Sequence, residues 1–238
     1  MVVSSNTLFQ FTRDFDTILK ILESKGFWPK YCIEFGWRDK SKTDFAVPQC
    51  CFCDIPLSAI NNHMKTYGDY GIGMTKEWGI NKGLSPVMYV IPNSHLINIL
   101  KEISRSSNDK EGKRKYIAFL KCYKAVNYRF KENKWKQYNN YLYYNEREWR
   151  YVPSRLSADK IVIKVDKKED FNPVDLNYET KTYLCDFSAH DIRYMIVKDD
   201  EERLRLIEEI NKLSNWNKSE KDLLSSKILT HALIEEDI

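Results

Sequence analysis

The sequence predicts an α+β fold with a mixed central sheet, flanking helices and further helices at the C-terminal end. The chain has 238 residues, of which 42% are hydrophobic, so it can bury a sizeable core. Apolar residues at helical spacing gather near both ends of the chain, and short apolar or aromatic runs typical of strands lie between them. This distribution favours a mixed α+β domain.

The opening segment predicts a strand that leads directly into a helix. The stretch from Leu8 to Thr12 is typical of a short buried strand. Apolar residues at i, i+3, i+4 and i+7 then predict a helix lined by Phe15, Ile18, Leu19 and Leu22. Thr12 or Asp14 can cap its start, and Gly26 suits a left-handed stop.

The middle of the chain, from Val47 to Val90, holds five of the eight glycines. Cys50 to Asp54 predicts a compact strand, and a helix that ends at Gly68 follows it. Gly71 and Gly73 lie in the next expected strand. They leave little side-chain bulk on one face of that strand, which gives room for a ligand or another backbone.

The remaining elements complete the predicted sheet and its helices. Further strands are expected at 87–91, 141–152, 161–165 and 193–197. Further helices are expected at 96–103, 204–213 and 219–234. We therefore expect residues 1–198 to form an α+β core domain and residues 199–238 to form a helical segment that packs on the core or on a partner.

Several function classes are disfavoured by composition. No signal region precedes Thr7 and no run approaches the roughly 20 apolar residues of a membrane span, so we expect a cytoplasmic protein that binds no membrane. Six irregularly spaced cysteines indicate reduced thiols. Cys50 and Cys53 form a CxxC pair with His63 after it, but no second pair completes a closed zinc site, so no metal is expected.

The segment from Lys110 to Lys136 is strongly basic. Ten Lys or Arg stand against two Glu, a net charge of +8, and aromatic residues are interleaved with them. The charge favours a solvated basic hairpin or helix beside an acidic C-terminal helix. The interleaved aromatic residues are also typical of nucleic-acid grooves, and equally of half-buried strands. If nucleic acid binds, the expected phosphate contacts are Lys113, Arg114, Lys121, Lys124, Lys131 and Lys134. Residues 199–238 carry the opposite balance, a net charge of −5.

One strand carries the candidate acid–base residues. On a strand, Glu146, Glu148 and Arg150 point to one face, with neighbours about 7 Å apart. Two carboxylates with a guanidinium could position a sugar hydroxyl or act as acid and base. The alternative is a surface ladder of salt bridges.

Five segments together resemble a known family. They are SNTLFQFT near the start, CFCDIPLS, YGDYGIGMTKEWG, PVMYV and EREWRYVP. From Ser5 to about Val197 they resemble the AbiGi family of bacterial abortive-infection proteins, named for phage resistance and described as the antitoxin of a two-gene system. The resemblance implies a cytoplasmic defence component whose cognate toxin, encoded beside it, is nucleotidyltransferase-like.

A more distant resemblance concerns mechanism. The order of an early strand and helix, a YGxYG segment and a late glutamate on a strand is similar to ADP-ribosyltransferases of the DNA-modifying DarT type. The resemblance implies a cofactor site for NAD at Gln10 and Thr12, beside Gly71 and Gly73. It also implies catalytic roles for Glu148, with Glu146 beside it, and for Tyr67 or Tyr70. Gln10 replaces the Arg or His of those enzymes, and glutamine brings no cation to the pyrophosphate.

Two hypotheses of different classes follow. The first is an interaction protein, an antitoxin or regulator that neutralises a partner toxin. The second is an enzyme that uses NAD to modify nucleic acid or protein. Nucleic-acid binding through the basic segment can accompany either.

Overall fold

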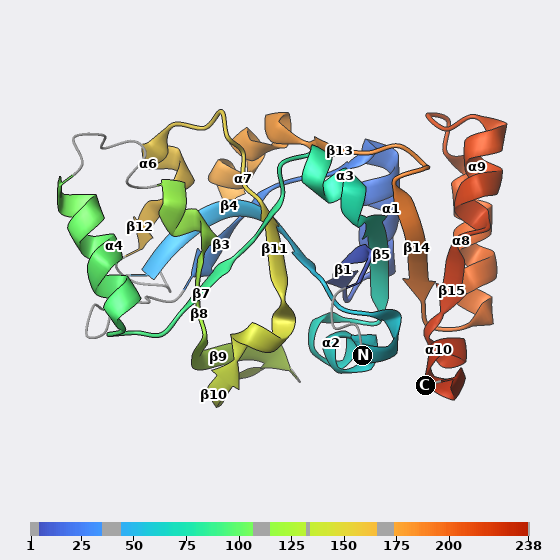
Figure 1. The fold of residues 1–238 in the computed structure, drawn as a ribbon. Helices are drawn as coiled ribbons and strands as arrows, with labels where there is room; N and C mark the ends of the chain where they lie inside the picture. Colours follow the sequence, from blue (N-terminus) through green and yellow to red (C-terminus); the bar gives the residue numbers. More distant parts are fainter. Residues whose placement is uncertain (1–4, 35–43, 107–114, 132–133, 166–173, 238) are drawn as a thin grey trace. The chain divides into compact units, whose positions relative to one another are not determined.

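The structure is a computed structural model that describes residues 5–34, 44–106, 115–131, 134–165 and 174–237 (Figure 1). It divides into two compact units. The first consists of Met1–Phe27, Cys51–Leu84 and Leu184–Ile238, and the second of Trp28–Cys50 and Ser85–Tyr183. Each unit combines strands with helices, and a mixed sheet is present, which confirms the predicted α+β class.

The first unit is built on a mixed sheet with the strand order β15-β14-β5-β1-β4. Its strands are β1 (Thr7–Thr12), β5 (Tyr70–Thr75), β14 (Ile192–Val197), β15 (Ile228–Thr230) and the end of β4 (Asp44–Cys53). β14 and β15 run parallel, and the other neighbouring pairs are antiparallel. The short strands β2 (Gly26–Phe27) and β13 (Cys185–Asp186) pair with each other.

Helices cover both faces of this sheet. They are α1 (Phe15–Ser24), α2 (Ile60–Tyr67), α3 (Lys76–Asn81), α8 (Asp200–Lys212), α9 (Lys218–Ser225), α10 (His231–Asp237) and the 3-10 turn η1 (Leu57–Ala59). On one face, Met64 of α2 and Ile234 of α10 share a buried cluster with Phe9 of β1. On the other face, Phe15 of α1 packs its ring edge-on against Tyr70 of β5, with centroids 5.9 Å apart.

α1 forms where the sequence predicts it, and its ends show why. Asp14 caps the N-terminus by accepting the Asp16 amide. The left-handed residue at the C-terminus is Lys25, with φ 50°, and not Gly26. Gly26 is required for packing, because a Cβ there would lie 2.5 Å from Leu184 Cγ.

One helix predicted for the C-terminal segment is wrong. Residues 199–238 belong to the first unit, and the single helix expected at 219–234 is split into α9 and α10 by β15. Ile228 and Thr230 of β15 lie beside Met195 and Val197 of β14. Without β15, the backbone groups along this edge of β14 would have no strand partner. The hydrogen bonds between β15 and β14 outweigh the helical propensity that the spacing of apolar residues indicates.

The second unit is built from several groups of paired strands. Its strands are β3 (Lys30–Glu34), the start of β4, β6 (Ser85–Pro86), β7 (Met88–Val90), β8 (Leu120–Cys122), β9 (Lys124–Lys131), β10 (Lys134–Leu142), β11 (Glu148–Tyr151) and β12 (Ile163–Val165). β3 and β12 both pair antiparallel with β4, β11 pairs with β6, β7 pairs parallel with β8, and β9 pairs with β10.

Helices of the second unit contribute buried residues to separate apolar clusters. They are α4 (His95–Ser106), α6 (Ala158–Ile161), α7 (Val174–Thr180) and the 3-10 turns η2 (Tyr116–Phe119), η3 (Tyr143–Glu146) and η5 (Lys181–Tyr183). Ile97 of α4 is buried with Val90, Leu120 and Cys122. Among the described residues, no helix has the length and apolar character needed to cross a membrane.

The first prediction concerns Gly68, the residue that ends α2. Its φ is +132°, and a Cβ there would lie 2.1 Å from the Thr12 carbonyl oxygen. Gly68→Ala should therefore lower the free energy of unfolding by roughly 3 kcal/mol or more, as measured by urea denaturation. Gly83→Ala is the control: its φ is +77° but no atom lies within 4 Å of the added Cβ. It should cost only about 1 kcal/mol, and equal losses would contradict the steric explanation.

Candidate functional site

The second unit holds a buried cluster of ionised side chains around Arg150 of β11. The Arg150 side chain is 0% exposed. Its Nε donates to Glu148 Oε1 at 2.6 Å, and its Nη2 donates to Glu148 Oε2 at 3.2 Å and to Glu34 Oε1 at 2.7 Å. Its Nη1 donates to the Ala118 carbonyl at 2.6 Å. A guanidinium without access to water needs acceptors at every nitrogen, and this arrangement provides them.

Lys121 of β8 is the second cation of the cluster. Its Nζ lies 3.1 Å from Glu34 Oε2 and 3.4 Å from Glu148 Oε2. It also lies 4.7 Å from the centre of the Tyr143 ring. Burial by itself lowers the pKa of Lys121, but the carboxylates of Glu148 and Glu34 outweigh it, and the pKa is raised well above its ordinary value. Lys121 therefore stays charged at neutral pH.

Polar neighbours complete the surroundings of the two cations. Gln49 of β4 donates from Nε2 to Glu34 Oε1 at 2.9 Å, and its buried Oε1 has no hydrogen-bond partner within the described ranges. The Tyr89 hydroxyl accepts the Glu148 amide at 2.8 Å. Burial raises the pKa of the hydroxyls of Tyr89 and Tyr143, so both stay neutral.

The local backbone places Glu148 and Arg150 in the cluster by strand alternation. The expected strand at 141–152 is interrupted by η3, and Arg147 takes the left-handed conformation with φ 46°. Glu148 and Arg150 then share one face of β11, as predicted, and the structure buries that face. Glu146 is buried too, but it lies in η3 and not on the strand.

Sequence reasoning missed three members of the cluster. Glu34, Gln49 and Lys121 come from β3, β4 and β8, and Glu34 lies 116 positions from Arg150 in the chain. Glu34 and Gln49 lie in segments without a motif, and Lys121 lies in the basic segment, where the sequence predicts a phosphate contact. A weak signal for Lys121 exists, because it stands between two apolar residues of a three-residue strand.

The chemistry available to this cluster is mainly electrostatic. Both oxygens of Glu148 already accept from Arg150, and one of them also faces Lys121. The predicted surface ladder of salt bridges is thus a buried network. Such a network fixes the positions of β3, β8 and β11 more than it offers a free base.

The other predicted site residues lie in the first unit. The register of β1 against β5 places Gln10 beside Ile72 and Thr12 beside Tyr70. The Tyr70 hydroxyl donates to Glu202 at 2.6 Å, and burial, followed by that hydrogen bond, raises its pKa. Tyr67 is exposed at the end of α2.

Gly71 and Gly73 have their open side occupied by aromatic rings. An added Cβ would lie 2.9 Å from Phe11 at Gly71 and 2.7 Å from Phe9 at Gly73. The first two segments of the expected NAD site are therefore adjacent strands of one unit, whereas Glu146 and Glu148 belong to the other unit. A joint NAD site stays a prediction.

The basic segment forms an antiparallel ribbon, β9 with β10, which agrees with a hairpin. Lys113 and Arg114 lie outside the described residues, as do the side chains of Lys131 and Lys134. Lys124 is exposed, whereas Lys121 is turned into the ion cluster. Phosphate binding by this segment stays a prediction.

The cysteines carry free thiols. Burial raises the pKa of Cys122 to about 11 and that of Cys185 to about 12, which makes both thiols unreactive at neutral pH. In the part of the chain that the structure describes, no group of three or more His, Cys, Asp or Glu is placed to hold a metal ion.

Comparison with known proteins adds a family to this geometry. The family described as "Putative abortive phage resistance protein AbiGi, antitoxin" matches residues 25–198. An abortive phage resistance protein AbiGi from Lactococcus lactis subsp. cremoris is 29% identical over 249 positions, which cover 89% of this chain and 99% of that protein. No solved structure matches the chain. The matched residues include the whole of the ion cluster.

The second prediction concerns Arg150. Arg150→Leu leaves two buried carboxylates, Glu34 and Glu148, with Lys121 as their one remaining cation among the described residues, so it should lower the free energy of unfolding by about 3–5 kcal/mol in urea denaturation. Combining it with Glu148→Gln should recover part of the loss, because one buried charge is removed. The control is Lys160→Leu, whose ion pair with Glu179 is about half exposed on both sides. Lys160→Leu should leave the urea midpoint of unfolding unchanged. An unchanged urea midpoint for Arg150→Leu would refute the stabilising role of the ion cluster.

Proposed function

This chain belongs to the AbiGi family of abortive phage resistance proteins, and we propose that it is the antitoxin of an abortive-infection pair, acting in the bacterial cytoplasm. In this role it binds a cognate toxin protein directly and neutralises it. The observation that carries the proposal is the family match over residues 25–198, whose description names an antitoxin. The expected toxin is nucleotidyltransferase-like.

α4, the green helix in Figure 1, supplies a surface suited to such a partner. Its buried side packs through Ile97, with Leu100 partly buried beside it. Its exposed side carries a second apolar row: Leu96 is 40% exposed, Ile99 38% and Ile103 54%. Residues at i, i+3 and i+7 fall in one line along a helix, so these three side chains form a stripe.

A stripe of this kind is the pattern by which a helix docks in an apolar groove of another protein. Single exposed apolar residues are ordinary, but three in line on one helix are not. Exposed polar residues, His95, Asn98 and Glu102, stand beside the stripe. An apolar centre with a polar rim is the anatomy of a protein interface. We therefore assign the toxin-binding face to α4.

The ion cluster supports a binding role more than a catalytic one. A catalytic glutamate needs an oxygen that can accept a proton or a ribose hydroxyl. Both Glu148 oxygens accept hydrogen bonds from Arg150. The ion pairs of the cluster hold β3, β8 and β11 together. A rigid second unit is what a docking helix needs behind it, because a preorganised surface loses less entropy on binding.

One observation favours a second candidate function, an NAD-dependent ADP-ribosyltransferase. Gln10 and Thr12 face Ile72 and Tyr70 on neighbouring strands, so two of the three resembling segments are adjacent. The third segment contains Glu148, which is already paired. This candidate therefore depends on whether NAD binds at all.

The third prediction tests the antitoxin role. Cells that express the toxin encoded beside this gene should grow when the wild-type chain is co-expressed. Ile99→Glu combined with Ile103→Glu should abolish this protection and weaken toxin binding at least a hundredfold, because two charges enter an apolar contact. Binding is measured by titration calorimetry with the purified proteins.

The matched control on the same helix is Asn98→Glu. Asn98 is exposed but lies off the stripe, so protection should persist. Unchanged toxicity with the wild-type chain at equal expression would reject the antitoxin proposal. Protection that survives the double substitution would reject only the assignment to α4.

The fourth prediction separates the two functions. If NAD binds, a concentration of about 100 times its dissociation constant adds roughly 2.7 kcal/mol to stability, which raises the melting temperature. We expect no such rise for the wild type, because Gln10 brings no cation to the pyrophosphate. Gln10→His is the informative variant, since it leaves the ion cluster intact. A rise for either protein would favour the enzyme, and comparison of Glu148→Gln with Glu146→Gln would then locate its catalytic carboxylate.

A further inference from the structure

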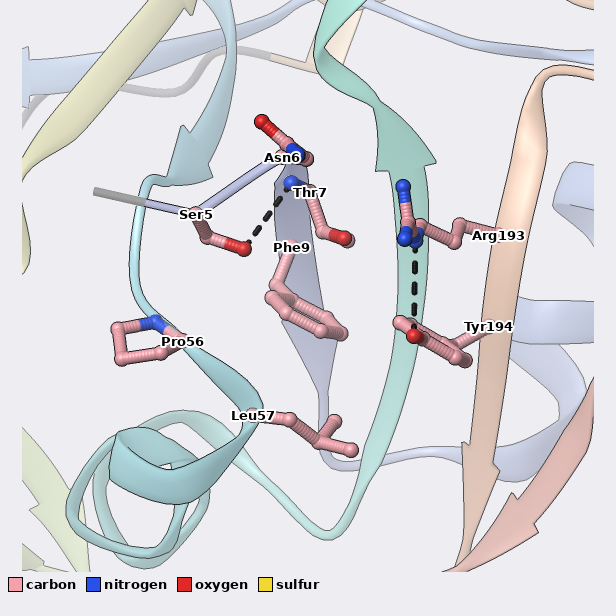
Figure 2. A pocket seen from close by; sticks show the side chains of 8 residues that line it. All are labelled: Ser5, Asn6, Thr7, Phe9, Pro56, Leu57, Arg193 and Tyr194. Carbon is pink, nitrogen blue, oxygen red and sulfur yellow. Dashed lines mark hydrogen bonds between the residues drawn. The ribbon is translucent and has the colours of Figure 1, made fainter. Parts of the chain in front are cut away.

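A small cavity in the first unit is not explained by the antitoxin role. Its volume is about 190 Å³. It is lined by Ser5, Asn6, Thr7, Phe9, Pro56, Leu57, Arg193 and Tyr194 (Figure 2). At ~30 Å³ per water molecule, this volume suits a ligand with one ring and one substituent.

The cavity has an aromatic side because β5 carries a glycine at one position. Phe9 of β1 and Tyr194 of β14 both lie beside Gly73 in the sheet register. With no side chain between them, the two rings lie nearly parallel, 6.2 Å apart with an angle of 8°. A Cβ at Gly73 would lie 2.7 Å from the Phe9 ring, so the pair could not form with any larger residue there.

Apolar and polar groups occupy different ends of the cavity. In the view of Figure 2, Leu57 lies at one end and Asn6, Thr7 and Arg193 lie at the other. Leu57 begins η1 directly after Pro56, which brings both side chains to the wall. The cavity is therefore amphipathic along its length.

The polar end offers hydrogen-bond donors and a cation. Ser5 is held by its amide, which donates to Asp54 at 2.8 Å, and its Oγ accepts the Thr7 amide at 3.0 Å. The Ser5 hydroxyl hydrogen can then be donated to a ligand. Arg193 is exposed, and its Nε is 3.5 Å from the Tyr194 hydroxyl. Among the described residues, no carboxylate forms an ion pair with Arg193, so its charge is available to an anion.

We propose that this cavity binds a small aromatic carboxylate. The ring of the ligand lies against Tyr194 and Leu57, and its carboxylate accepts from Arg193 and Ser5. Arginine is the residue best suited to a planar carboxylate, and aromatic walls favour a flat ring. This site is independent of the toxin-binding face on α4.

The test uses benzoate and benzamide, which have the same shape but differ in charge. Binding to the full chain is followed by amide chemical shifts in two-dimensional NMR. Benzoate should shift the amides of residues 5–7 and 193–194 and should bind at least tenfold more tightly than benzamide, a difference of about 1.4 kcal/mol.

Three variants assign the contacts. Arg193→Gln removes the charge at an exposed position and should make the two affinities equal. Leu57→Ala should weaken both compounds together. Lys198→Gln removes an exposed cation that follows β14 and should change neither affinity. Equal affinity of the wild type for both compounds, or the absence of shifts at the cavity residues, would overturn the proposal without bearing on toxin neutralisation.

Discussion

The second unit depends on a guanidinium that has no access to solvent. Arg150 must find acceptors within the protein, and it takes them from Glu148 on its own strand, Glu34 on β3 and the carbonyl of Ala118 in η2. Lys121 then balances the second carboxylate. Because an unpaired charge in this position costs several kcal/mol, these segments cannot shift independently. The network therefore fixes the arrangement of short strands that have few backbone hydrogen bonds of their own.

In the first unit the equivalent constraint is steric. β5 lies between β1 and β14, and its glycines at positions 71 and 73 let side chains of the flanking strands meet above it. Close packing of this kind tolerates no added Cβ. Because the two glycines have no side chains, aromatic rings of the neighbouring strands occupy the space beside them. The nearly parallel rings of Phe9 and Tyr194 border the cavity for the same reason.

The family match covers the structural features of the second unit described above. The AbiGi match covers the ion cluster, whose ion pairs join β3, β8 and β11, and α4, which carries three exposed apolar residues in line. Glu148, whose catalytic role stays a prediction, pairs with Arg150 and Lys121 in the structure. Charged residues at short spacing on a strand thus have a structural use as plausible as a catalytic one, and only their partners distinguish the two.

The sequence by itself determined the α+β class, the opening strand and helix, and the shared face of Glu148 and Arg150. These features follow from periodicity and from contacts between near neighbours in the chain. It did not determine that β15 would interrupt the last predicted helix, or that Glu34 and Lys121 would meet across 87 positions. The tertiary structure decided both, because the partners of a strand edge and of a buried charge are residues that are distant in the chain. The local spacing of residues does not identify such partners.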